Sequence, residues 1–317
     1  MTPARALVTG ASGFVGANVL RRLARDDIET HAAVHTLDGT WRLAGIAEGV
    51  CVHTVDITDA PACDALLQRV RPDWVIHCAA HGAYSWETNM REILATNVLG
   101  TAALLEASAR TGVSAFVHTG SSSEYGFKDH APDEADPVEP TTAYAVGKAA
   151  ATLLCSGVAS AMGLRAVTLR LYSVYGPWEE PRRLMPQLVA AASNGQLPPL
   201  VDPLVARDFV HVDDVCEAII VAAARGGAGA VYNVGSGVQT TLAELVELVR
   251  ARFGVLADPQ WSTMERRVWD THTWVADPSR IEAELGWKAT TALEDGLWRF
   301  AEWMAADPDR QARYRTA

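Results

Sequence analysis

The first half of the chain alternates short apolar runs with longer amphipathic segments. The apolar runs predict strands at Ala6–Thr9, Thr30–Val34, Val50–Val55, Trp74–Cys78, Ala115–Thr119 and Ala166–Leu171. Apolar residues at helical spacing predict helices at Gly16–Arg25, Ala60–Arg69, Arg91–Arg110 and Tyr144–Met162. Strands that are apolar throughout are buried on both faces. We therefore expect an α/β fold with a Rossmann-type, doubly wound parallel sheet.

The rhythm changes after Gly176, where prolines at 177, 181, 186, 198, 199 and 203 favour loops and short helices over a regular sheet. Beyond them the pattern predicts a strand at Ala230–Val234 and helices at Asp213–Ala224, Leu242–Phe253, Ile281–Leu285 and Leu293–Met304. We expect a Rossmann domain of residues 1–174 that also receives parts of 207–235. Residues 175–317 then form a smaller, mixed substrate-binding lobe interwoven with it.

Composition narrows the classes of partner. The 317 residues include 27 Lys and Arg against 38 Asp and Glu, a formal charge of −11, and 49% are hydrophobic. This balance excludes a nucleic-acid partner, which needs clustered cations, but not a small phosphorylated ligand. No apolar run approaches the roughly 20 residues of a membrane span, and the five cysteines show no C-x-x-C pair. We expect a cytoplasmic protein without a membrane partner.

A glycine-rich loop follows the first predicted strand. Gly10, Gly13 and Gly16 are spaced G-x-x-G-x-x-G before a helix, the context in which a loop binds the pyrophosphate of a dinucleotide. We expect the loop to bind NAD or NADP, also through three residues between the glycines: Ser12, Phe14 and Val15.

The sequence leaves the choice of dinucleotide open. The second strand ends without the acidic residue that binds the adenosine ribose of NAD. His35, Thr36 and Arg42 could instead accommodate the 2′-phosphate of NADP, or His35 and Thr36 are loop residues without that role. Further cofactor contacts are expected after the third and fourth strands: Asp56, Ile57, Ala79 and Ala80.

A candidate catalytic pair lies on one predicted helix. Tyr144 and Lys148 are four residues apart and so share a helix face. A tyrosine with a pKa near 10 is a poor base at neutral pH, and a lysine cation beside a nicotinamide cation lowers this pKa. Ser121, at the end of a strand and before Tyr144, is placed to hydrogen-bond the same substrate hydroxyl or carbonyl.

Together these motifs resemble one family over essentially the whole chain. The phosphate loop, Tyr144 with Lys148, Asn97 in ATNVLGT, the segment RDFVHVDD that begins at Arg207, and the LGW that begins at Leu285 are similar to extended short-chain dehydrogenase/reductases. The similarity is to the branch of nucleotide-sugar epimerases and dehydratases.

The resemblance implies a role for each matching residue. Tyr144 would be the acid/base, Lys148 its helper, Ser121 the third catalytic residue and Asn97 a structural residue. Arg207 and Arg267, with Asp270 near the latter, would contact the diphosphate of a nucleoside-diphosphate sugar, as arginine forks do. The sugar pocket would also include His81, Ser122, Ser123, Tyr172 and Ser173.

One departure from the family pattern bears on the reaction. Typical 4,6-dehydratases carry a Glu where this chain has Ser123, and Glu124 would point elsewhere on an extended segment. Epimerisation at C4 through a transient keto-sugar, with tightly bound NAD(P), is therefore the favoured reaction. A keto-sugar reductase, a dehydratase and, more remotely, a non-catalytic NADP-sensing scaffold are the alternatives. We expect no metal site, and a homodimer formed through two long helices, as is common in the family.

Overall fold

A computed structural model describes residues 3–46, 49–265, 267 and 270–315. Seven parallel strands form its central sheet in the order β3-β2-β1-β4-β5-β6-β9. The strands are β1 (Arg5–Thr9), β2 (Glu29–Val34), β3 (Val50–Thr54), β4 (Trp74–His77), β5 (Ala115–Ser121), β6 (Ala166–Leu171) and β9 (Val231–Val234). The sequence order reverses at β1, which creates the crevice where such sheets bind ligands. The expected doubly wound α/β fold is confirmed.

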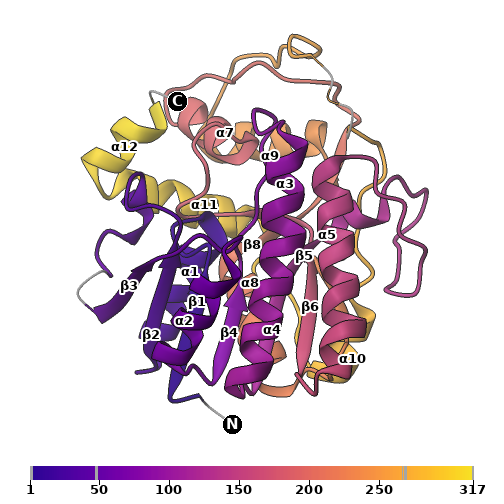
Figure 1. Ribbon diagram of the computed structural model, residues 1–317. Helices are drawn as coiled ribbons and strands as arrows, with labels where there is room; N and C mark the ends of the chain where they lie inside the picture. Colours follow the sequence, from indigo (N-terminus) through magenta and orange to yellow (C-terminus); the bar gives the residue numbers. More distant parts are fainter. Residues whose placement is uncertain (1–2, 47–48, 266, 268–269, 316–317) are drawn as a thin grey trace.

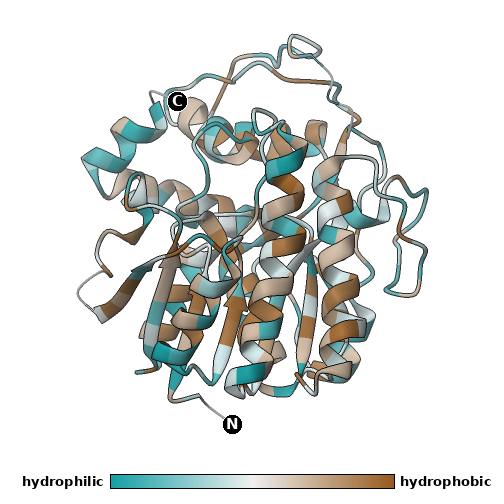
Figure 2. Cartoon of the chain, in the orientation of Figure 1, coloured by the Kyte–Doolittle hydropathy of each residue, from teal (hydrophilic) through white to brown (hydrophobic). Residues whose placement is uncertain are grey.

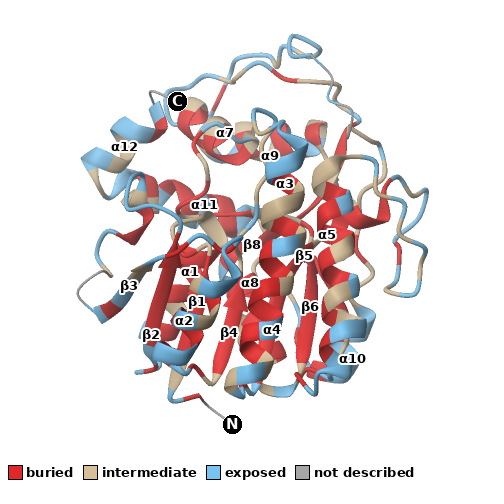
Figure 3. Ribbon diagram, in the orientation of Figure 1, coloured by how far each residue is buried: buried red, intermediate tan, exposed pale blue. Residues whose placement is uncertain are grey.

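Successive strand residues pack against opposite helix layers. In β1, Ala6 and Val8 join the core under α1 (Phe14–Ala24), α8 (Val212–Arg225) and α10 (Ser279–Leu285), whereas Leu7 joins the core under α2 (Ala60–Val70) and α4 (Thr101–Thr111). Both faces are therefore dry, which explains why these strands are apolar without alternation. Figures 2 and 3 show the apolar, buried sheet between its helix layers.

A second lobe covers the carboxyl edge of the sheet (Figure 1). A three-stranded sheet of β7 (Ser173–Tyr175), β8 (Ala206–His211) and β10 (Gln239–Thr241) has β8 in the middle, parallel to β7 and antiparallel to β10. Its separate hydrophobic core lies against α7 (Leu184–Ala192), α9 (Leu242–Phe253), α11 (Leu293–Ala305) and α12 (Pro308–Arg315). The smaller mixed lobe is thus present, and its strands form a sheet of their own.

The two long helices predicted beside the catalytic residues are each interrupted by π-helical turns. Between α3 (Met90–Leu94) and α4 the residues Ala95–Gly100 form a π turn, and α5 (Ala143–Leu153) continues through a π turn at Leu154–Val158 into α6 (Ala159–Ala161). Short 3-10 helices occupy Thr40–Leu43 and Ser122–Tyr125. Such π turns are frequent at functional sites because they redirect single side chains.

Within the described residues, no helix is long and apolar enough to span a membrane.

Candidate active site

The glycine-rich loop is shaped by contacts that exclude side chains. Gly10 has a φ of 64°, and a Cβ there would lie 2.5 Å from the backbone nitrogen of Ala79 at the end of β4. A Cβ on Gly16 would lie 2.3 Å from the carbonyl oxygen of Gly10. The loop can therefore fold tightly against β4 only with glycine at these positions. Its backbone forms a cradle before α1 that fits a pyrophosphate.

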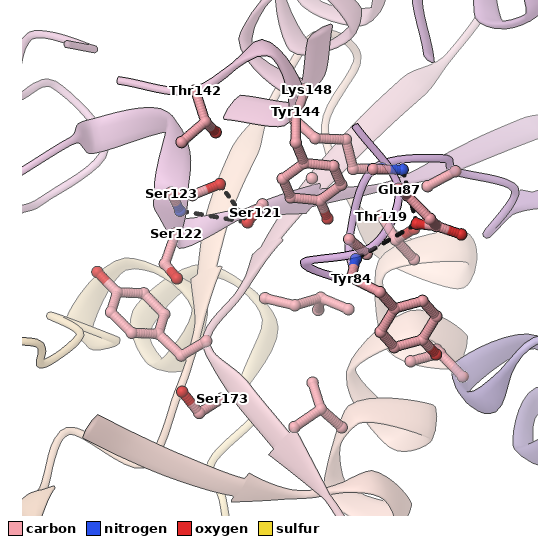
Figure 4. A pocket seen from close by; sticks show the side chains of 18 of the residues that line it. Tyr84, Glu87, Thr119, Ser121, Ser122, Ser123, Thr142, Tyr144, Lys148 and Ser173 are labelled. Atoms are coloured by element: carbon pink, nitrogen blue, oxygen red, sulfur yellow. Dashed lines mark hydrogen bonds between the residues drawn. The ribbon is translucent and has the colours of Figure 1, made fainter. Parts of the chain in front are cut away.

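Tyr144, Lys148 and Ser121 line one cavity of about 610 Å³ at the carboxyl edge of the sheet, together with the glycine loop. Thr142 caps α5 by accepting a hydrogen bond from the Ala145 N–H (3.1 Å), so the helix begins just before Tyr144. Figure 4 shows the phenol between the Ser121 side and the Lys148 side of the cavity. The three predicted catalytic residues are thus brought together.

Burial dominates the electrostatics of the pair. Burial raises the pKa of Tyr144 to about 12, although the hydrogen bond with Ser121 acts to lower it. Burial also lowers the pKa of Lys148 to about 8, opposed by the charge of Glu124. The expected lowering of the tyrosine pKa is therefore not seen in the chain alone, because desolvation of the phenolate has the largest effect. A bound cofactor cation would add the missing stabilisation.

The serine-rich turn after β5 differs from the extended segment that we expected. Ser122–Tyr125 is a 3-10 helix, and Ser121 and Glu124 form a capping box. The Glu124 carboxylate is fully buried, accepts a hydrogen bond from the Ser121 N–H (2.8 Å) and pairs with the Arg170 guanidinium (2.9 Å). Glu124 therefore points away from the cavity, as expected. The reason is the buried ion pair that holds it, not an extended backbone.

The Ser121 hydroxyl has a neighbour of its own kind. Its Oγ lies 2.8 Å from the Ser123 Oγ, and both serines line the cavity with Ser122. The position that carries Glu in typical dehydratases thus presents only a short hydroxyl to the substrate space.

A network of buried polar side chains connects β1 to the start of α4. The His77 Nδ1 contacts the Thr9 Oγ1 (2.7 Å) and its Nε2 contacts the Thr101 Oγ1 (2.9 Å), whose hydroxyl donates to the Asn97 carbonyl (2.6 Å). Burial lowers the pKa of His77 to about 3, so the ring is neutral and carries its proton on Nε2. Asn97 in turn binds both backbone groups of His81 (2.8 and 2.9 Å), which agrees with a structural role.

A second cavity of about 560 Å³ lies in the smaller lobe and shares lining residues with the first. Ser173 and Arg207 line both cavities, whereas Arg267 and Asp270 line only the second. The Asp270 carboxylate accepts from the Arg207 guanidinium (3.1 Å) and from the Arg267 N–H (2.8 Å), so it joins both arginines. Tyr172 lines the first cavity, and burial raises the pKa of its phenol.

The residues expected at the adenine end lie outside the cavity. His35 is largely exposed and its Nε2 is 3.9 Å from the Asp56 carboxylate, which closes a turn by accepting hydrogen bonds from Thr58. Thr36 is exposed on the loop that follows β2. Ile57 is buried in the core beside α4. They follow the adjacent strands β2 and β3, so they share one end of the carboxyl edge.

Arg42 does not fit the role of a 2′-phosphate ligand. Its guanidinium is buried, donates to the Trp178 carbonyl (2.7 Å) and pairs with Glu180 (3.2 Å). It connects the Rossmann sheet to the smaller lobe instead.

Of the remaining predicted contacts, Phe14, Val15 and Ala80 line the first cavity, whereas Ser12, Ala79 and His81 are not among its lining residues. The lining residues that the sequence did not predict include two charged ones, Glu87 and Arg183. Glu87 belongs to the loop between β4 and α3, where no periodic pattern or motif marks individual side chains. Arg183 falls in the proline-rich segment, which gave no positional signal.

Known proteins are similar to this chain over most of its length. The NAD dependent epimerase/dehydratase family model matches residues 6–235. The chain belongs to this family. Its members are NAD-dependent enzymes of nucleotide sugars, and the solved relatives include complexes with NAD.

Individual relatives include both kinds of enzyme. A dTDP-glucose 4,6-dehydratase of Streptomyces antibioticus is 31% identical over 308 residues, which cover 94% of this chain and 91% of the relative. A UDP-glucose 4-epimerase of Thermus thermophilus in complex with NAD has a TM-score of 0.84 and 27% identity, covering 95% of this chain and 99% of that one. A dTDP-glucose 4,6-dehydratase of Streptomyces venezuelae has a TM-score of 0.85 and 28% identity, covering 96% and 98%.

Proposed function

We propose that this protein epimerises a nucleoside-diphosphate sugar at C4 through a transient keto-sugar, with NAD held tightly between turnovers. The observation that carries the proposal is the cavity that Ser121, Tyr144 and Lys148 line, which presents Ser123 where dehydratases of the family carry a glutamate. An epimerase must oxidise and reduce the same carbon, and this needs a base beside a hydride acceptor but no further carboxylate.

Each catalytic residue has a step that its position supports. The Tyr144 oxygen takes the proton of the C4 hydroxyl and later returns it, while the Ser121 Oγ hydrogen-bonds the same substrate oxygen. Lys148 supplies a cation that stabilises the phenolate of Tyr144. NAD, when bound, supplies the hydride acceptor. Epimerisation would require the keto-sugar to turn within the cavity before it is reduced on its other face.

The second cavity supports binding of the nucleotide part of the substrate. Arg183 and Arg207 lie where the two cavities meet, and Arg267 lies further along the second. Guanidinium groups bind diphosphate oxygens in pairs and gain strength where water is excluded. The diphosphate is therefore expected between the two cavities, with the sugar toward Tyr144 and the nucleoside in the lobe.

We propose NAD over NADP because Arg42, the cation that could have bound a 2′-phosphate, is held by other groups. Arg42 is buried against Trp178 and Glu180, which leaves the uncharged Thr36 and the largely exposed His35 beside the expected adenosine ribose. Mass spectrometry of nucleotides that co-purify with the protein tests this: NADP as the bound species would overturn it.

The decisive experiment follows the stereochemistry of the product. Purified protein is incubated with UDP, dTDP, GDP and CDP sugars, and products are identified by NMR. We expect a C4 epimer without net consumption of added cofactor. A 4-keto-6-deoxy product would instead assign the 4,6-dehydratase activity that several curated relatives carry by name. Stoichiometric oxidation of added NAD(P)H would assign a reductase.

We further propose a homodimer. Apolar side chains stay exposed along α3–α4 and α5–α6, among them Leu99 (63%) and Leu153 (64%). These outer helix faces together offer a surface that a second copy could bury.

A further inference from the structure

Glu87 is a carboxylate on the wall of the catalytic cavity. It lies in the loop between β4 and α3, and its side chain is 21% exposed. Figure 4 shows it beyond the Tyr144 ring on the side away from Ser121 and Ser123. Among the lining residues that the structure describes, it is the only acidic one, while Lys148 and two arginines supply positive charge.

The loop itself fixes this carboxylate. The Glu87 Oε2 accepts hydrogen bonds from the backbone N–H groups of Gly82 (2.8 Å) and Tyr84 (3.3 Å). The Oε1 lies 3.5 Å from the Nδ1 of His81. These contacts hold the carboxylate in one orientation on the cavity wall, and each of its oxygens has more than one lone pair with which to accept a hydrogen bond. Glu87 is therefore suited to bind substrate hydroxyls.

The negative charge of Glu87 also affects which sugars can bind in the cavity. A sugar hydroxyl can donate to an ionised carboxylate, whereas a sugar carboxylate would place a second negative charge beside it in a partly desolvated site. We propose that Glu87 is a specificity-determining residue that positions a neutral sugar through its hydroxyls and rejects a sugar bearing a carboxylate. This inference rests on the proposed function, because it assigns the space beside Tyr144 to the sugar of a nucleotide sugar.

Two variants separate the charge from the fold of the loop. In Glu87→Gln, the amide oxygen can keep the bonds to Gly82 and Tyr84 while the charge is lost. Glu92→Gln is the matched control: the Glu92 carboxylate lies 3.6 Å from the other nitrogen of the same His81, but its side chain is 63% exposed and is not on the cavity wall.

Two ligands are compared, a hexose and a hexuronate on the same nucleoside diphosphate. Calorimetry measures the binding of each, and where product forms, kcat and KM are measured as well. UDP-glucose and UDP-glucuronic acid are the first pair, and the GDP, dTDP and CDP sugars of the panel serve if UDP does not bind. We expect Glu87→Gln to weaken hexose binding and to shift the hexuronate-to-hexose preference by roughly tenfold or more toward the hexuronate. Glu92→Gln should leave the preference unchanged.

Three outcomes would overturn the inference: an unchanged preference in Glu87→Gln, an equal shift in Glu92→Gln, or a loss of NAD affinity in Glu87→Gln with sugar binding intact. The last would place Glu87 against the cofactor. If the wild-type protein binds no sugar nucleotide of any base, the proposed function itself fails. That result is distinguishable because it appears before any variant is made.

Discussion

The buried ion pair between Glu124 and Arg170 is joined to the backbone of Ser121, and its disruption gives a quantitative test. The Glu124 side chain is fully buried and that of Arg170 is 6% exposed, with 2.9 Å between Oε2 and Nε. In Glu124→Gln the amide oxygen can still accept from the Ser121 N–H, but the Arg170 cation loses its counter-charge. Removing one partner of a buried pair costs about 3–5 kcal/mol of unfolding free energy.

The expected shift in melting temperature follows from chain length. An unfolding entropy of about 2.1 cal/mol/K per residue over 317 residues gives about 0.67 kcal/mol/K, so the loss corresponds to about 5–8 °C. Scanning calorimetry measures it. The double variant Glu124→Gln with Arg170→Met removes both charges and should recover most of the loss, because neither group is then buried unpaired. A shift below 2 °C in the single variant, or a double variant less stable than the single one, would refute the reasoning.

Four further predictions follow from the site and the surface. Tyr144→Phe should keep the melting temperature and reduce turnover by about three orders of magnitude, measured by NMR; unchanged turnover would support a non-catalytic sensor. kcat/KM should fall at alkaline pH with a midpoint near the pKa of Lys148, about 8, because the ammonium is lost as pH rises. Lys148→Arg should be slow but should not show this fall, because arginine stays charged. Burial raises the pKa of Glu179 to about 8, so the folded wild type loses stability as pH rises from about 4.5, where the unfolded chain ionises, to 8. Glu179→Gln has no such group, so it should match the wild type near pH 4.5 and become more stable than the wild type up to pH 8. Urea titrations should show this difference growing by at most about 1.4 kcal/mol per pH unit. Leu99→Asp with Leu153→Asp should convert a dimer into a monomer in light scattering; a wild-type monomer would remove the proposal.

Where the chain's own local pattern decides the structure, sequence reasoning succeeded. The central strands are buried on both faces, so each appears as a largely apolar run. The requirement for Gly16 is also local, because its Cβ would meet the carbonyl oxygen of Gly10. Gly10 is required by Ala79 just after β4, but its spacing from Gly13 and Gly16 before a helix is visible in the sequence. Tyr144 and Lys148 need only a helix to share a face.

The parts that were missed depend on distant partners. β8 exists because it pairs with Ser173–Tyr175 on one side and Gln239–Thr241 on the other, segments that lie far from it in sequence. The turn after β5 was expected to be extended. The Ser121–Glu124 capping box begins a 3-10 helix there, and the distant Arg170 pairs with the same buried carboxylate. Glu87 owes its place in the cavity to backbone hydrogen bonds that no side-chain pattern reveals.

The π turn at Ala95–Gly100 also determines which changes of length this helix can accept. A π turn holds one residue more than an α turn, so deleting one residue there can restore an α turn while α3 and α4 keep their faces. Ile93, which packs against Gly82 at the base of the Glu87 loop, would then keep that contact. A deletion within α3 after Ile93 has no extra residue to remove, so it would rotate Ile93 by about 100° relative to α4 and move it away from the Glu87 loop.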